Sequence, residues 1–231
     1  METVNPNAMY WILFIGVAVI SYIVQALFQR RIDSASRCPL NLSGREVADR
    51  MLSDHGIRDV RVISTRGKLT DNFNPTDMTV NLSEAVYGQY NAAAAAVAAH
   101  ECGHAVQHAT GYGPIRLRSA LVPVVSFASR AVTWILLAGM FLINIFPQVM
   151  LAGIILFAFT TLFSLVTLPV EINASRRALA WLDRSGITDS YNHQAAEGAL
   201  RAAAYTYVVG ALSSLATLIY YILIFTSGRR N

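Results

Sequence analysis

The chain alternates long apolar runs with polar stretches, and four runs are long enough to cross a membrane. The first covers residues 9–28 and contains no charged side chain before two arginines follow it. The second and third lie within 119–168, where Pro147 marks the turn between them, and the fourth is 202–226. Because about 20 apolar residues cross a hydrocarbon core as a helix, these runs predict four transmembrane helices.

Two polar stretches, 29–118 and 169–201, separate these spans and are expected to lie on one side of the membrane. The pattern predicts five segments: an anchor over 9–28, a first polar segment over 29–118, a transmembrane hairpin over 119–168, a second polar segment over 169–201 and a last span over 202–226. The expected fold is therefore a mostly α, multi-pass membrane protein with about four transmembrane helices.

The first polar stretch also predicts local structure. Ser43 and Glu46 form a capping box, which is typical of the start of a short helix. Residues 60–64 and 78–82 alternate like strands and flank a turn-rich loop, which predicts a β-hairpin or small sheet. An exposed strand edge there would align a substrate backbone by β-augmentation, and a purely structural role for the strands fits equally well.

Composition and charge narrow the class of protein. The chain is 54% hydrophobic and 14% charged, unlike an ordinary soluble domain. A formal charge of +4 without a basic run longer than a pair argues against a nucleic-acid partner and leaves the lipid bilayer as the surrounding partner. Two cysteines make neither a disulfide framework nor a thiolate metal site of known spacing.

The distribution of charge predicts the orientation. Sixteen of the eighteen Lys and Arg residues lie in 29–130 and 169–201, which leaves Arg229 and Arg230 elsewhere. The positive-inside rule therefore places both polar stretches in the cytoplasm and the N-terminus outside. Because no basic region precedes the first apolar run, we expect an uncleaved anchor rather than a signal peptide.

The strongest chemical signal is the motif His100-Glu101-Cys102-Gly103-His104. Histidines four residues apart on a helix project from one face, one turn apart, which suits two ligands of a tetrahedral zinc site. Glu101 can then take a proton from the zinc-activated water as general base. We expect Gly103 to keep a side chain off a crowded face and Cys102 to be a buried small hydrophobe.

A zinc peptidase needs a third protein ligand. His108 lies roughly 12 Å along the helix axis from His100 and cannot share its metal. Glu171 is the better candidate. It lies just after Pro169, at the start of a predicted helix. A carboxylate among apolar residues is costly unless it has a positive partner, and zinc would be one. The alternative is a first-turn acid stabilised by the helix dipole or paired with a nearby arginine.

Several stretches of the chain resemble the motifs of a known protein family. Beyond the HExxH motif, the matching stretches are Leu168-Pro169-Val170-Glu171, Ala174-Ser175-Arg176-Arg177-Ala178, residues 69–75 and Thr206-Tyr207. The chain resembles the bacterial membrane zinc metallopeptidases of the YugP type, relatives of HtpX and the CAAX prenyl proteases. The resemblance implies a gluzincin-like HExxH helix, the ligands His100, His104 and Glu171, Glu101 as catalytic base, and a bacterial plasma (inner) membrane location.

The chain departs from the family pattern at a few positions. Asn72 and Asn74 stand in a segment that often reads Asp-His-Tyr-Asp-Pro, and Asn173 stands where Asp is common. HtpX-type relatives place an Asp where this chain has Ser175. None of these positions is a proposed ligand, so the departures concern the residues that support the ligands and align substrate.

The expected function is hydrolysis of peptide bonds in a peptide or membrane-protein substrate at the cytoplasmic membrane face. Zinc plus one further donor would stabilise the tetrahedral intermediate, for which His193 and Tyr207 are candidates and Arg201 a weaker one. The alternative is a catalytically inert membrane scaffold that keeps a zinc site. The sequence names neither the substrate nor the oligomeric state.

Overall fold

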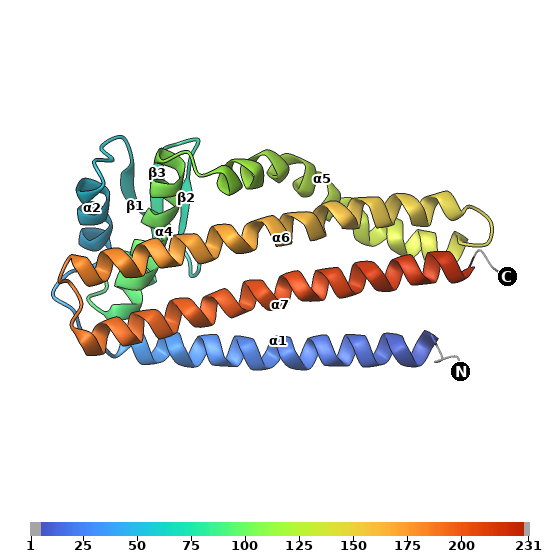
Figure 1. Cartoon of the computed structure of the whole chain (residues 1–231), viewed down its shortest axis with the longest axis horizontal. Helices are drawn as coiled ribbons and strands as arrows, with labels where there is room; N and C mark the ends of the chain where they lie inside the picture. The colour runs from blue at the N-terminus through green and yellow to red at the C-terminus, as the bar shows by residue number, and fades with distance from the viewer. Residues whose placement is uncertain (1–5, 229–231) are drawn as a thin grey trace. The chain divides into compact units, whose positions relative to one another are not determined.

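The computed structural model describes residues 6–228, so the two terminal arginines, Arg229 and Arg230, lie outside the described residues. The fold is mostly helical with one small sheet, which confirms the predicted fold class. In chain order (Figure 1) the elements are α1 (Pro6–Ser36), α2 (Gly44–Asp54), β1 (Arg61–Thr65), β2 (Asn72–Asn74), β3 (Thr79–Ser83), α3 (Glu84–Tyr87), α4 (Ala92–Ala109), α5 (Gly113–Leu142), α6 (Pro147–Arg184) and α7 (Ser190–Gly228).

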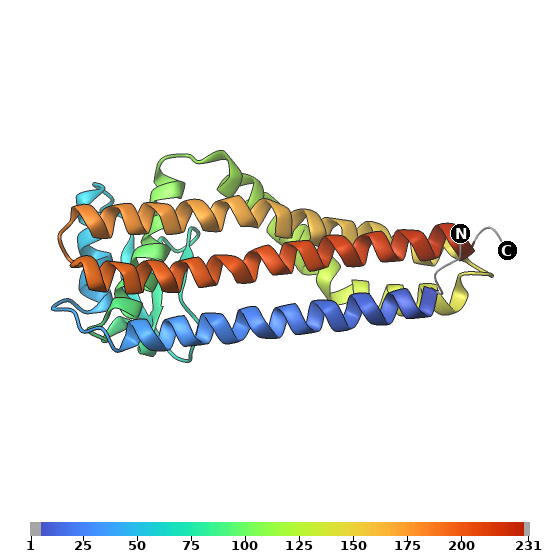
Figure 2. The same cartoon turned by 60° about the horizontal axis from the view of Figure 1, so that its bottom comes forward.

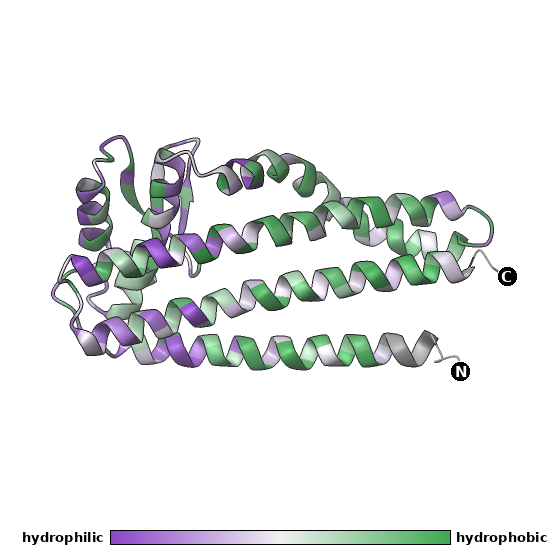
Figure 3. Ribbon diagram, viewed as in Figure 1, coloured by the Kyte–Doolittle hydropathy of each residue, from purple (hydrophilic) through white to green (hydrophobic). Residues whose placement is uncertain are grey.

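Four of the described helices, α1, α5, α6 and α7, are long and apolar enough to cross a membrane, as the sequence predicts. Figure 3 shows hydrophobic colours along most of α5 and along the C-terminal part of α7. Each of the four helices extends beyond its predicted span, because the flanking polar residues continue the helix instead of ending it.

The chain forms two compact units that share α1, α5, α6 and α7. We call the first the apolar unit; its described residues are 6–23, 117–168 and 207–228. The second, the α/β unit, comprises 24–116 and 169–206 and contains the sheet and the HExxH motif.

Within the apolar unit, α5 and α6 meet at Gly139, where an added Cβ would lie 2.6 Å from Met150 Cα. The parts of α6 and α7 that belong to this unit run side by side in Figure 1 and Figure 2. The hydroxyl groups of Thr161 and Ser214 join them, with Oγ1 and Oγ 2.8 Å apart. Large apolar side chains such as Phe141 are exposed on the outside of the unit. Such a surface suits hydrocarbon rather than water.

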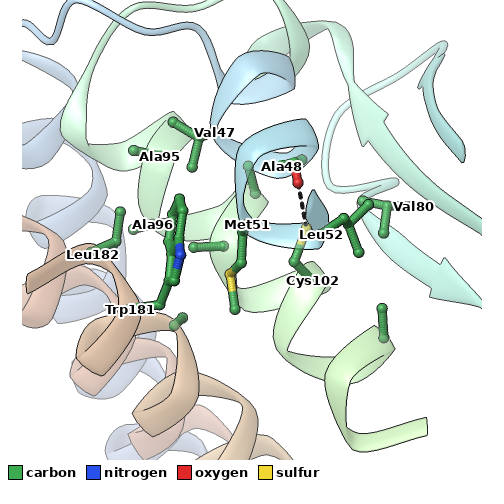
Figure 4. Close-up of a cluster of buried hydrophobic side chains, with 14 of the residues drawn as sticks. Val47, Ala48, Met51, Leu52, Val80, Ala95, Ala96, Cys102, Trp181 and Leu182 are labelled. Atoms are coloured by element: carbon green, nitrogen blue, oxygen red, sulfur yellow. Dashed lines mark hydrogen bonds between the residues drawn. The ribbon is translucent and has the colours of Figure 1, made fainter. Parts of the chain in front are cut away.

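Within the α/β unit, α2 packs on α4 around an apolar core (Figure 4). Met51 of α2 is fully buried, and Trp181 of α6 joins the same cluster while its indole N–H donates to Asp54 Oδ2 at 3.0 Å. Cys102 is buried as expected and directs its Sγ to Ala48 O at 3.6 Å. The alanine-rich first half of α4 allows this close approach of helices.

The two predicted strands are present, but they do not form a hairpin with each other. β1 pairs with β3 in parallel, and β2 pairs with β3 antiparallel, giving the order β1-β3-β2. The hairpin lies instead between β2 and β3, where Met78 has a positive φ of 52° at the turn. The short β2 was not predicted because three residues carry too little alternation to be recognised.

The expectation that a new helix begins after Pro169 is wrong. Pro169 lies inside α6, which runs unbroken from Pro147 to Arg184. Proline removes one backbone hydrogen bond, but a long apolar helix tolerates this loss where no water competes for the remaining bonds. Glu171 is therefore an interior residue of α6, and the alternative of a first-turn acid does not apply.

Candidate metal and active site

The site is built on one face of α4. Asn91 caps the helix by accepting a hydrogen bond from Ala94 N at 2.9 Å, and Gly111, with a φ of 65°, follows its end. Four residues at the helical spacing i, i+3, i+4 and i+7 contact α6: His100, Gly103, His104 and Gln107. Toward the start of α4 this face continues with the small residues Ala96 and Ala93.

At Gly103, α4 approaches α6 very closely. An added Cβ there would lie 2.6 Å from the carbonyl oxygen of Ala174, a distance that real Cβ atoms do not reach. This confirms the expectation that Gly103 keeps a side chain out of a crowded face. On α6, Glu171 and Ser175 flank Ala174 on the same face, so the crossing brings both polar side chains to the two histidines.

The structure brings the three predicted ligands together. His100 Nε2 lies 3.1 Å and His104 Nε2 lies 3.5 Å from Glu171 Oε2, and the three donor atoms all lie within 4.8 Å of one another. Tetrahedral bonds of about 2.0–2.1 Å place neighbouring donor atoms roughly 3.3 Å apart. Two imidazoles and one carboxylate are also an established ligand set of catalytic zinc sites, so these residues fit zinc.

Burial strengthens this interpretation. Glu171 is 2% exposed and His104 is 6% exposed. A buried carboxylate is costly unless a positive group compensates it, and a cation held with His100 and His104 would do so.

Glu101 lies beside this group but is not a member of it. It is 9% exposed, and its Oε2 accepts a hydrogen bond from the backbone N–H of Phe73 in β2 at 3.1 Å. The Phe73 ring in turn lies against His108, with ring centroids 5.7 Å apart. The strand β2 therefore fixes one oxygen of this carboxylate, and Glu101 directly follows His100 in the chain.

The departures from the family pattern have structural roles. Asn72 Oδ1 accepts from Asn81 Nδ2 at 2.6 Å across β2 and β3. Asn74 Oδ1 accepts from Thr76 N at 2.9 Å and so shapes the turn after β2. Asn173 Oδ1 accepts from Arg177 Nε at 2.8 Å and from Gln107 Nε2 at 3.0 Å. At Asn74 and Asn173 the amide oxygen accepts hydrogen bonds, as an oxygen of the Asp common at these positions would.

The candidates for oxyanion stabilisation are placed differently. His193 is in the first turns of α7 and contacts Thr188 Oγ1 at 3.3 Å, near the end of α6. Glu171 lies thirteen residues before that end, about 20 Å along the helix axis. Arg201 pairs with Glu197 on the exposed side of α7. Tyr207 belongs to the apolar unit, and a role for it at the site stays a prediction.

Sequence reasoning missed Gln107 and the contact made by Ser175. Gln107 is fully buried and contacts His104 Nδ1 through Oε1 at 3.0 Å, and Ser175 Oγ lies 3.0 Å from His100 Nδ1. One signal was available for Gln107. It is a polar residue three positions after His104, on the ligand face of an otherwise apolar helix.

Comparisons with known proteins agree with this geometry. The family model described as "Putative neutral zinc metallopeptidase" matches residues 10–226. The "Putative membrane protease YugP" of Bacillus subtilis (strain 168) is 43% identical over 187 residues, which cover 81% of this chain and 82% of that protein. No solved structure matches the chain. The match to a membrane protease and the four apolar helices place the chain in the membrane, and the family match over almost the whole chain places it in a peptidase family. The chain belongs to the zinc metallopeptidase family that this model describes.

Proposed function

We propose that the protein is a membrane zinc metalloendopeptidase that hydrolyses peptide bonds with Glu101 as general base. The observation that carries the proposal is the convergence of His100, His104 and Glu171 beside a buried Glu101 whose carboxylate is held by β2. The family and the YugP relative support a protease role for this arrangement.

Bound to the three ligands, zinc would polarise the scissile carbonyl as a Lewis acid and lower the pKa of water. The Phe73 N–H holds Glu101 Oε2, so we assign Oε1 to the attacking water. Glu101 accepts one proton as the water oxygen bonds to the carbonyl carbon. It then delivers this proton to the nitrogen as the C–N bond breaks, which releases a carboxylic acid and an amine.

The test is Glu101→Gln in the purified full chain, assayed on a mixed peptide library with and without a chelator. Glutamine keeps the size of the side chain but cannot accept the proton, so cleavage should fall about 10²–10⁴-fold while zinc content is unchanged. The parent should lose cleavage with chelator and regain it with zinc.

The same variant separates the protease from an inert scaffold. If Glu101→Gln cleaves at the parent rate, the general-base assignment is wrong. If the parent binds zinc but cleaves nothing in the library, and the variant restores the phenotype of a deletion strain as well as the parent does, the scaffold hypothesis is favoured.

We further propose that the site faces the cytoplasm of a bacterial plasma membrane. The support is the concentration of sixteen of eighteen Lys and Arg residues in 29–130 and 169–201. Reversing the topology would carry all sixteen outward, against the positive-inside rule.

Cysteine labelling tests this orientation with little background. Cys38 and Cys102 are both buried, and burial raises the pKa of the Cys102 thiol, which lowers its reactivity. Arg66→Cys, in the exposed loop after β1, should resist a membrane-impermeant thiol reagent in intact cells. Asn144→Cys, between α5 and α6, is the matched control and should label. The reverse pattern would overturn the orientation.

A further inference from the structure

Gln107 is a fully buried polar side chain on the ligand face of α4, and its carboxamide makes three hydrogen bonds. Oε1 lies 3.0 Å from His104 Nδ1. Nε2 donates to the carbonyl oxygen of Val170 at 2.8 Å and to Asn173 Oδ1 at 3.0 Å. The side chain therefore links the ligand helix to two residues of α6.

The orientation of this carboxamide follows from its partners. The carbonyl oxygen of Val170 can only accept a hydrogen bond, so the amide nitrogen of Gln107 must face it. The Asn173 atom next to Gln107 is also an acceptor, because Arg177 Nε donates to it at 2.8 Å. With the nitrogen on this side, the oxygen of Gln107 must face His104.

The orientation of the Gln107 carboxamide also fixes which ring nitrogen of His104 carries the proton. An amide oxygen only accepts, so Nδ1 of His104 carries the hydrogen and Nε2 presents its lone pair. Nε2 is the nitrogen that lies 3.5 Å from Glu171 Oε2, in the proposed ligand group. We infer that Gln107, held by Val170 and Asn173, is a positioning residue that keeps His104 in its metal-binding tautomer. This inference rests on the proposed zinc site.

His100 has a different kind of hydrogen-bond partner at its Nδ1. His100 Nδ1 contacts Ser175 Oγ at 3.0 Å, and a hydroxyl can either donate or accept. Ser175 can therefore orient the His100 ring but cannot dictate which nitrogen carries the proton. The two ligands on α4 thus differ in how strictly their tautomer is set.

The test measures zinc affinity of the full chain in detergent by competition with a chromophoric chelator. Gln107→Met keeps the length of the side chain but removes the acceptor, and affinity should fall about 10–100-fold, as for other partners of metal-bound histidines. Gln107→Glu is the matched variant. It keeps an oxygen toward His104 Nδ1 but loses the donor to Val170 O and Asn173 Oδ1, so its affinity should fall less than that of Gln107→Met.

A second pair of variants tests the orientation of the carboxamide without touching a ligand. Asn173→Leu removes an acceptor that holds the Gln107 nitrogen, so zinc affinity should fall. Asn173→Asp keeps an acceptor oxygen for both Gln107 and Arg177, so affinity should be retained. Thermal unfolding of each metal-free variant shows whether the fold itself has changed.

The outcomes separate this inference from the proposed function. If Gln107→Met binds zinc as tightly as the parent, or if Gln107→Glu loses as much affinity as Gln107→Met, the positioning role is wrong and Gln107 is a packing residue. A parent that binds zinc but does not cleave peptides contradicts the protease proposal and leaves the affinity comparison intact. A parent that binds no zinc overturns both.

Discussion

Two helix crossings on α6 leave equally little room for a side chain but have different surroundings. In the α/β unit, an added Cβ on Gly103 of α4 would lie 2.6 Å from Ala174 O; in the apolar unit, one on Gly139 of α5 would lie 2.6 Å from Met150 Cα. The first crossing is flanked by the proposed ligands His100, His104 and Glu171. The second is surrounded by an apolar cluster: Val132, Leu136, Met150 and Ile154.

Both helix pairs pack closely at a glycine. The side chains that flank the glycine determine whether the contact can also bind a ligand. Glycine lets two backbones approach until neighbouring side chains converge. At Gly103 the converging side chains are the proposed metal ligands. At Gly139 they are hydrocarbon, so that crossing holds helices together without any chemistry.

The largest expected effect comes from removing the carboxylate at the first crossing. Glu171→Gln leaves only His100 and His104 as protein ligands, so zinc content should fall to a small fraction of that of the parent, and cleavage with it. Elemental analysis of the purified protein measures this. Glu197→Gln, which removes an acid paired with Arg201 on α7, is the control and should keep its zinc. Full zinc content in Glu171→Gln would indicate a different third ligand.

Widening the first crossing should affect both fold and metal. Gly103→Ala places a methyl group against Ala174 O, which costs about 1–3 kcal/mol of unfolding free energy as overpacking. Because α4 must move away from α6, zinc affinity should fall as well. Gly88→Ala in the same unit, where an added Cβ meets nothing within 4 Å, should change neither quantity. An unchanged zinc affinity in Gly103→Ala would show that the crossing does not set the ligand distances.

Widening the second crossing should separate stability from metal binding. Gly139→Ala places a methyl group against the backbone of Met150, and a similar loss of about 1–3 kcal/mol is expected. Zinc affinity of the folded protein should not change, because this crossing lies in the apolar unit. Thermal unfolding and chelator competition on the same preparation measure both quantities. A loss of zinc affinity equal to that of Gly103→Ala would contradict the comparison.

The smallest expected effect concerns the polar contact of the apolar unit. Thr161→Val removes the hydroxyl that contacts Ser214 Oγ between α6 and α7. Polar contacts between membrane helices average about 0.6 kcal/mol, so the thermal midpoint should fall only slightly. Thr160→Val, which removes a hydroxyl bonded to Phe157 O in its own helix, is the control. A large loss in Thr161→Val would mean that this contact anchors the unit.

Much of the fold was predictable because its signals are local. Each span is a continuous apolar run, the capping box places the start of α2, and the HExxH spacing places both histidines on one helix face. The strand pairing was less predictable, since β1 and β3 are parallel neighbours with β2 between them in the chain. Pro169 suggested a helix end because local propensity does not register the surroundings that keep α6 continuous.

The sequence by itself identified the residues that we propose to carry the chemistry: His100, Glu101 and His104 by spacing, and Glu171 as a carboxylate that an apolar setting makes costly. Only the tertiary structure decided how they meet. The approach of Gly103 to Ala174, the amide of Phe73 on Glu101 and the bonds of Gln107 join segments distant along the chain. Periodicity and capping depend on neighbours a few residues apart, whereas these contacts depend on how whole helices pack, which no local pattern encodes.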